Sequence, residues 1–306
     1  MHEETNKPEH YIGRFAPSPT GPLHFGSLIA AVGSYLDAHA HHGEWQLRID
    51  DLDQPRTVPG ATEAILRALE GFGFEWSGPI IYQSRRREAY EEALDLLQER
   101  AQLYACACTR KNIAESGTHG SFGPIYPGTC RNGIQADQAP RALRCLTTSE
   151  PVCLDDRLQG RYCQQLENEI GDFVVRRADN IIAYQLATVV DDADQGVTDI
   201  VRGVDLLDST PRQVHLQNLL RLPTPRYMHL PIAVNAQHEK LSKQTHASAV
   251  DTENNVQLLF QTLVFLNQNP IPELELASLD ELWNWARANW KPSHLPHARE
   301  IIVLES

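Results

Sequence analysis

Short apolar runs alternate with longer stretches of spaced apolar residues over the first hundred positions of the chain. Consecutive apolar residues predict strands, whereas apolar residues three or four positions apart predict helices with one buried face. We expect Pro59 to start the second helix and Ser84 to cap the third. Such alternation is typical of a parallel sheet that helices cover on both faces. The predicted strands are 11–16, 45–49 and 80–82, and the predicted helices are 27–41, 59–72 and 84–102.

The pattern stops after position 103 and resumes only beyond 165. The intervening segment has many glycines and prolines and no helical period, which predicts an insertion at 104–165. It also holds all the cysteines. In a reducing compartment their clustering favours metal binding or reactive thiols over disulfides. The cysteines are Cys106, Cys108, Cys130, Cys145, Cys153 and Cys163.

Beyond the insertion the chain again predicts regular elements, and from position 254 it reads as mostly helical. Asp179-Asn180 separates two apolar runs and predicts a hairpin turn. The sequence Ser209-Thr210-Pro211 is typical of a helix start. The predicted strands are 173–177, 181–184, 198–203 and 228–234, one helix is predicted at 183–191, and a polar loop follows at 237–244.

Composition narrows the classes of protein that remain. The 306 residues, 42% of them hydrophobic, are enough for one large or two medium domains with proper cores. No apolar run approaches the ~18 residues of a membrane span, and the polar, acidic N-terminus has no signal-peptide pattern, so we expect a cytoplasmic protein without membrane contact. The net charge of −13 argues against a broad nucleic-acid surface. Arg85-Arg86-Arg87 and Arg176-Arg177 remain candidates for local RNA contact or for solvated helix faces.

The turn between the first strand and the first helix is the strongest candidate for chemistry. It is rich in proline and glycine, and it places His24 and Gly26 at a predicted helix N-terminus. Unpaired N–H groups and the helix dipole suit a polyphosphate there, although such a turn is also ordinary helix punctuation. The second predicted strand ends in three carboxylates, Asp50, Asp51 and Asp53, where open α/β sheets bind their ligands.

The His-x-Gly turn and the distant Lys240-Leu241-Ser242-Lys243 together resemble the two signatures of class I aminoacyl-tRNA synthetases. The resemblance implies a Rossmann-type doubly wound parallel sheet that binds ATP, with Mg²⁺ as its companion ion. It assigns ATP contacts to His24, Gly26, Lys240, Ser242 and Lys243. Of these, His24 and Lys243 would be catalytic, because Lys243 would stabilise the departing pyrophosphate.

The stretch 13–21 is similar to the opening of glutamyl- and glutaminyl-tRNA synthetases. The resemblance implies that Asp50 holds the amino group of glutamate, where the family usually has Glu. A forked guanidinium suits a carboxylate, and Arg14 and Arg202 lie at the C-terminal ends of two predicted strands, although a set of structural ion pairs is the alternative. The implied glutamate-binding residues are Arg14, Phe15, Ala16, Pro17, Ser18, Asp50, Tyr184 and Arg202.

Cys106-x-Cys108 followed by Tyr126-x-x-x-Cys130 looks like the zinc site of glutamyl-Q tRNA(Asp) synthetases, short paralogues that attach glutamate to a queuosine base. The resemblance implies one structural Zn²⁺ bound by these four residues; three buried free thiols are the alternative. It divides the chain into the two halves of the catalytic domain at 1–103 and 166–250, a zinc-binding insertion at 104–165, and a short helical C-terminal region at 251–306.

Only about sixty residues follow Lys243, so we expect no anticodon-binding domain. The resemblance then implies a monomer that activates L-glutamate without tRNA and transfers it to queuosine in the anticodon loop of tRNA(Asp). Three alternatives stay open. One is a truncated glutamyl-tRNA synthetase that charges a tRNA 3′ end, another a non-catalytic protein that binds RNA or a partner, and the third a nucleotidyltransferase with a small-molecule acceptor.

Overall fold

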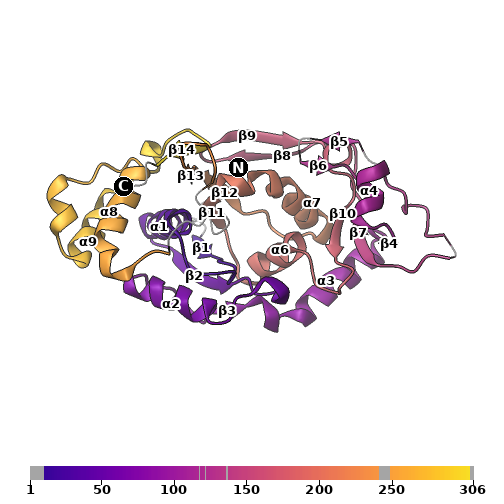
Figure 1. Ribbon diagram of the computed structural model, residues 1–306, viewed down its shortest axis with the longest axis horizontal. Helices are drawn as coiled ribbons and strands as arrows, with labels where there is room; N and C mark the ends of the chain where they lie inside the picture. Colours follow the sequence, from indigo (N-terminus) through magenta and orange to yellow (C-terminus); the bar gives the residue numbers. More distant parts are fainter. Residues whose placement is uncertain (1–9, 117, 121, 136, 241–248, 304–306) are drawn as a thin grey trace, which may run out of the picture.

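The computed structural model describes residues 10–303 except 117, 121, 136 and 241–248. Figure 1 shows an elongated molecule with a helical C-terminal region at one end and the cysteine-bearing segment, residues 104–165, at the other. A central sheet lies between these two ends. Within the described residues no helix is both long and apolar enough to cross a membrane.

The central sheet consists of two parallel ladders that meet at β1 and β11. The Thr198 N–H donates to the Ile12 carbonyl at 2.9 Å, and the Ile12 N–H donates to Thr198 Oγ1 at 2.9 Å. The strand order is therefore β3-β2-β1-β11-β12, which confirms the expected Rossmann-like sheet and places its order reversal between β1 and β11. The strands are β1 (Ile12–Phe15), β2 (Glu44–Ile49), β3 (Ile81–Tyr82), β11 (Asp199–Gly203) and β12 (Arg226–Leu230).

Helix α1 (Phe25–Ala40) packs against β1, β2 and β11, and Leu28, Ile29, Val32 and Leu36 are buried there, as their helical spacing predicts. The C-terminal helices α8 (Asn255–Phe265) and α9 (Leu279–Asn289) pack against α1 from the other side. They share one hydrophobic core with the first half of the sheet. The other helices are α2 (Ala61–Gly71), α3 (Arg87–Glu99), α4 (Arg110–Ser116), α5 (Leu166–Glu169), α6 (Tyr184–Asp194) and α7 (Thr210–Leu220).

Two predicted helix starts are wrong. Ser84 does not cap α3, because its N–H and hydroxyl donate instead to the Asp51 carboxylate at 2.8 and 2.7 Å. Residues Gln83–Arg85 form a short 3-10 turn, and α3 begins at Arg87. Helix α2 begins at Ala61, two residues after Pro59, because Gly60 takes a left-handed conformation (φ 78°) at its N-cap.

Two predictions of strands also need correction. The run 228–234 is interrupted at Pro231, whose ring provides no N–H, and divides into β12 and β13 (Ile232–Val234). β13 pairs in parallel with β14 (Glu300–Ile302), a short strand that no sequence signal predicted. The hairpin expected around Asn180 is reduced to one bridge between Arg176 and Ile182, because Tyr184 already begins α6.

The cysteine-bearing segment forms an antiparallel sheet in the order β10-β7-β4 and two hairpins, β5–β6 and β8–β9. A disulfide joins Cys153 to Cys163 across β8–β9, so the expectation that metal binding or free thiols would take precedence over disulfides was wrong for this pair. Opposite positions of an antiparallel hairpin bring these two cysteines together. The elements are β4 (Leu103–Cys106), β5 (His119–Gly120), β6 (Gly123–Pro124), β7 (Ala142–Cys145), β8 (Val152–Asp156), β9 (Gly160–Gln164) and β10 (Phe173–Arg176).

The expected insertion at 104–165 is closely connected to the rest of the chain. Its sheet includes β10, which follows residue 165, and the β8–β9 hairpin lies along α7 and β12 of the central domain. The domain boundaries predicted from the sequence therefore remain a prediction. Through the β8–β9 hairpin, side chains of the cysteine-bearing segment reach the central sheet.

Candidate functional site

A cavity of about 480 Å³ opens at the carboxyl ends of β1 and β11, where the strand order reverses. Open α/β sheets bind ligands at this point because the loops of two oppositely running halves diverge there. Every described residue predicted to contact glutamate or ATP lines it; Ser242 and Lys243 lie outside the described residues. The lining set from the sequence is Arg14, Phe15, Ala16, Pro17, Ser18, His24, Gly26, Asp50, Tyr184, Arg202 and Lys240.

Arg14 is buried at the end of β1 and pairs with Asp192 of α6. Nε donates to Asp192 Oδ1 at 3.1 Å and Nη2 donates to Oδ2 at 3.3 Å, while Arg48 Nη1 donates to Oδ1 at 2.6 Å. Burial raises the pKa of Asp192, but the two guanidinium groups outweigh that effect and lower it to about 2. Sequence reasoning gave neither residue a role: Asp192 directly follows the predicted helix 183–191, and Arg48 lies within the predicted strand 45–49.

Asp50 lies on the same cluster and lines the cavity. Arg48 Nε donates to its Oδ1 at 2.8 Å. Burial raises the pKa of Asp50 to about 6, against the charge of Arg48. This carboxylate is therefore desolvated, and a bound ammonium group would lower its pKa and stabilise its ionised form.

Arg202 stands near the end of β11, is almost fully buried and also lines the cavity. Its Nε donates to His229 Nε2 at 3.0 Å, and its Nη2 donates to Thr210 Oγ1 and Gln213 Oε1, each at 2.8 Å. Tyr184, the first residue of α6, is 38% exposed and lines the same cavity. Two arginines and an acid thus surround a space that an amino acid can occupy.

The N-terminus of α1 forms another part of the wall. His24 is the N-cap, and its Nδ1 accepts a hydrogen bond from the Ser27 N–H at 3.3 Å. The helix consequently starts at Phe25, earlier than the apolar spacing indicated. Lys240 Nζ donates to Asp205 Oδ2 at 2.6 Å, and both residues line the cavity. A sixteen-residue helix presents its positive end here, which suits phosphate oxygens.

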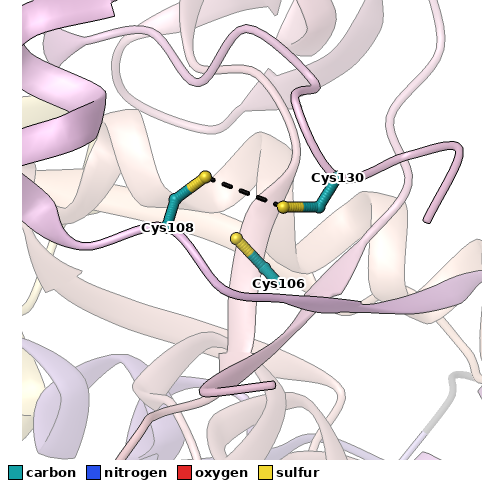
Figure 2. Close-up of side chains that lie close together, drawn as sticks. All are labelled: Cys106, Cys108 and Cys130. Carbon is teal, nitrogen blue, oxygen red and sulfur yellow. Dashed lines mark hydrogen bonds between the residues drawn. The ribbon is translucent and has the colours of Figure 1, made fainter. Parts of the chain in front are cut away.

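Three cysteines form a second candidate site in the cysteine-bearing segment. The Sγ atoms of Cys106, Cys108 and Cys130 all lie within 4.8 Å of one another. Figure 2 shows the sulfur atoms of Cys106 and Cys108, which share one stretch of backbone, turned toward that of Cys130, which comes from another. Tyr126 Oη lies 3.4 Å from Cys106 Sγ and 4.0 Å from Cys108 Sγ, so all four predicted ligand residues meet.

The surroundings favour a thiolate at Cys106, whereas burial and the neighbouring thiols Cys130 and Cys106 raise the pKa of Cys108 to about 11. Arg144 Nε donates to Cys106 Sγ at 3.2 Å, and its guanidinium lies 3.7 Å from the Tyr126 ring centroid. Burial raises the pKa of the Cys106 thiol, but hydrogen bonds with Tyr126 and Arg144 outweigh it and leave the pKa below its ordinary value. Gly171 (φ 75°) allows the backbone of Tyr126 to approach closely, since a Cβ at position 171 would lie 2.2 Å from the Tyr126 carbonyl oxygen. Three converging sulfurs that can hold a metal ion are present among the described residues.

Comparison with known proteins identifies the family. The family model described as tRNA synthetases class I (E and Q), catalytic domain, matches residues 12–268. A glutamyl-Q tRNA(Asp) synthetase of Aromatoleum aromaticum is 54% identical over 286 residues, which cover 94% of this chain and 90% of that protein. The chain belongs to the glutamyl-Q tRNA(Asp) synthetase family.

Two further similarities agree with that family. A glutamyl-Q tRNA(Asp) synthetase of Dechloromonas aromatica is 52% identical over 295 residues, covering 96% of this chain and 98% of that protein. The crystal structure of a glutamate-tRNA synthetase from Elizabethkingia anophelis superimposes with a TM-score of 0.76 at 23% identity, covering 95% of this chain and 67% of that one. This structural likeness shows the fold of a class I synthetase catalytic domain.

One arginine from each of the two basic runs that the sequence offered as RNA contacts, Arg86 and Arg177, forms ion pairs within the fold. Arg86 pairs with Asp191 at 2.6 Å and also with Asp194. Arg177 donates to Asp53 and Asp179, each at 2.7 Å. These guanidinium groups therefore hold neighbouring elements together, and their charge is locally neutralised.

Proposed function

We propose that this chain activates L-glutamate with ATP, forming glutamyl-adenylate and pyrophosphate, and then transfers the glutamyl group to queuosine in the anticodon loop of tRNA(Asp). The observation that carries this proposal is the cavity at the β1–β11 order reversal. It combines Arg14, Arg202 and Asp50 on its walls with His24 at the N-terminus of α1. Relatives of at least half-identical sequence that bear the name glutamyl-Q tRNA(Asp) synthetase support the same activity.

The first step requires positioning and charge stabilisation. Arg14 and Arg202 suit the carboxylates of glutamate, and Asp50 suits its ammonium group. An α-carboxylate oxygen attacks the α-phosphorus of ATP, the bond to the β-phosphate oxygen breaks, and pyrophosphate leaves. His24 and the N–H groups of α1 stabilise phosphate charge, and Lys243 stabilises the leaving pyrophosphate. Mg²⁺ that accompanies ATP neutralises part of that charge.

The second step needs no protein nucleophile. A hydroxyl of the queuosine cyclopentenediol attacks the glutamyl carbonyl carbon, its proton is released, and AMP leaves. In this proposal the enzyme contacts only a small part of the RNA. Arg86 and Arg177 are already paired with carboxylates, and the net charge of −13 provides little attraction for a long duplex. Recognition should therefore depend on the modified base and its loop.

Cys106, Cys108, Tyr126 and Cys130 would hold one structural Zn²⁺ in the cysteine-bearing segment. Thiolates are soft ligands that suit tetrahedral Zn²⁺, and four protein ligands leave no open position for catalysis. The convergence of the three sulfurs and the tyrosine hydroxyl supports this assignment. The ion would stabilise loops that contribute few apolar residues to any core.

Glutamate-dependent ATP–pyrophosphate exchange without tRNA tests the first step. We expect exchange with glutamate and ATP alone, because the adenylate forms before RNA is needed in this proposal. Glutamine and aspartate are the controls, and exchange should be far weaker with either. Folded protein that binds ATP but never exchanges would instead support a non-catalytic role.

The acceptor is tested with isolated anticodon stem-loops of tRNA(Asp). Labelled glutamate should transfer to the stem-loop that contains queuosine and not to the same RNA with guanosine, which lacks the cyclopentenediol hydroxyls. These stem-loops have no aminoacyl-accepting 3′ end, so any stable product lies in the loop. Charging of the 3′ terminal ribose of tRNA(Glu) would overturn the proposed acceptor in favour of a truncated glutamyl-tRNA synthetase.

A further inference from the structure

We propose that Asp156 and His229 form a positioning relay that fixes the Arg202 guanidinium for glutamate. Asp156 ends β8 of the disulfide-linked hairpin, His229 lies in β12, and Arg202 lies in β11. The inference rests on the proposed function, because it assigns a purpose to a residue of the glutamate site. It gives the β8–β9 hairpin a role in glutamate binding that is independent of the cysteine cluster.

The inner end of the relay is a completely buried acid–imidazole pair. His229 Nδ1 lies 2.6 Å from Asp156 Oδ2, and both side chains are fully shielded from solvent. Asp156 Oδ1 also accepts from the backbone N–H groups of Leu158 and Gln159 at 3.0 and 2.8 Å. A carboxylate with this many donors is ionised, and burial, which raises its pKa, is outweighed so that the pKa lies below its ordinary value. Asp156 consequently requires a hydrogen on Nδ1 of the imidazole.

The outer end of the relay follows from that tautomer. With the hydrogen on Nδ1, a neutral imidazole has a lone pair on Nε2, and Arg202 Nε donates to it at 3.0 Å. Burial and the charge of Arg202 lower the pKa of His229 to about 4, although Asp156 opposes them, so the ring is neutral at physiological pH. An imidazolium would offer Arg202 a donor instead of an acceptor. The order of the relay is therefore Asp156 to His229 to Arg202.

Further contacts hold the plane of the guanidinium. Nη2 donates to Thr210 and Gln213, and the Arg202 Cζ lies 5.4 Å from the centroid of the Tyr227 ring. That ring is stacked on His229, with 6.0 Å between the centroids and 10° between the planes. Arg202 Nη1 is buried and has no hydrogen-bond partner among the described residues. The two N–H groups of Nη1, on a charged residue that lines the cavity, can donate to an acceptor such as a bound carboxylate.

Two substitutions at one position separate the two ends of the relay. In His229→Asn the amide can replace Nδ1 and still donate to Asp156, but it does not reach Arg202. In His229→Gln the longer side chain can bring an amide oxygen to the position of Nε2. We expect His229→Asn to raise the KM for glutamate in pyrophosphate exchange by at least roughly tenfold, as the loss of one hydrogen bond to a charged group predicts. The KM for ATP should stay unchanged, and His229→Gln should remain within about threefold of wild type.

Thermal unfolding of each variant and direct binding of radiolabelled glutamate accompany the kinetics. Asp156→Asn covers the case in which the His229 variants do not fold. Its amide oxygen keeps the backbone N–H donors of Oδ1, so its NH2 group faces Nδ1 and the imidazole carries its hydrogen on Nε2, where it can no longer accept from Arg202. This variant too should raise only the KM for glutamate. An unchanged KM for glutamate in folded His229→Asn would overturn the relay, and so would equal changes in the KM for glutamate and the KM for ATP. The proposed function would still stand in either case if the wild-type protein is active. Wild-type protein without exchange activity would overturn the proposed function and the relay with it.

Discussion

Arg14 and Asp192 are joined by two parallel hydrogen bonds, although 178 positions separate them in the chain. The pair connects the end of β1 to α6. Arg14 lines the cavity, whereas Asp192, which holds its guanidinium, does not. Arg48 also donates to Asp192, so the acid keeps a buried partner when Arg14 is replaced. Arg14 can therefore be substituted without leaving Asp192 as an isolated buried charge.

We expect Arg14→Ala to raise the KM for glutamate, because one carboxylate contact is lost in both the ground state and the transition state.

Lys243→Ala should instead lower kcat for exchange and leave glutamate binding nearly intact, since its charge is needed when pyrophosphate departs. Steady-state exchange kinetics and equilibrium dialysis with labelled glutamate measure the two effects. The assigned division of roles is wrong if both variants lose binding and rate in the same proportion.

Asp50 should make glutamate binding depend on pH around 6. Burial raises its pKa to about 6 in the free protein, so the carboxylate gains a proton as the pH falls through that value and no longer attracts the ammonium group. Affinity for glutamate should fall as the pH decreases from about 7.5 to 5.5, whereas the carboxylates of glutamate itself stay ionised over that range. Equilibrium dialysis across this range measures it. Asp50→Asn should bind roughly 10- to 100-fold more weakly at pH 7.5 and lose this pH dependence; an unaltered pH profile would exclude Asp50 as the ammonium partner.

The cysteine cluster should bind one zinc per chain. Cys108→Ser should lose the metal, as measured by elemental analysis, and the 104–165 segment should become more susceptible to proteolysis. Cys145→Ser is the matched control, because Cys145 is also buried in this sheet but lies outside the cluster of three sulfurs. Fully active, metal-free wild-type protein with freely titratable Cys106, Cys108 and Cys130 would contradict a structural zinc site.

Asp172 should stabilise the same segment independently of metal. Its buried carboxylate accepts from Arg131 at 2.5 and 2.7 Å, from Tyr104 at 2.6 Å and from the Thr147 hydroxyl at 2.9 Å. Asp172→Asn should lower the free energy of unfolding by about 1.5–3 kcal/mol, the range for a hydrogen bond to a charged group. The exposed Asp155→Asn is the control, and chemical denaturation is the measurement.

The sign of the pH effect gives a second test of Asp172. Burial raises its pKa, but the hydrogen bonds outweigh burial and the folded-state pKa lies below its ordinary value. The stabilisation is therefore complete above the unfolded pKa of about 3.9 and disappears as the pH falls through the lower folded value. Wild type and Asp172→Asn should differ in stability at pH 7 and converge in strong acid. A constant difference down to low pH would show that the charge of Asp172 is not the cause.

Local patterns in the sequence determined the elements of the central domain. Apolar runs and helical spacing predicted β1, α1, β2 and β11 to within a few residues, because strand and helix periods depend on neighbours in the chain. The same local signals placed His24 and Gly26 at a helix N-terminus. The family resemblance of Cys106-x-Cys108 and Tyr126-x-x-x-Cys130 implied a cluster, and the structure brings these four residues together. Each of these features is encoded within a short window.

Only the tertiary structure decided which distant polar groups would meet. The contacts from Arg14 to Asp192 and from Asp156 to His229, the latter 73 positions apart, arise because sheet order and hairpin docking bring separate segments together. Strand β14 and the Cys153–Cys163 disulfide likewise depend on a partner strand that no local period specifies. The physical reason is that a buried charge needs a partner in space, at whatever distance along the chain.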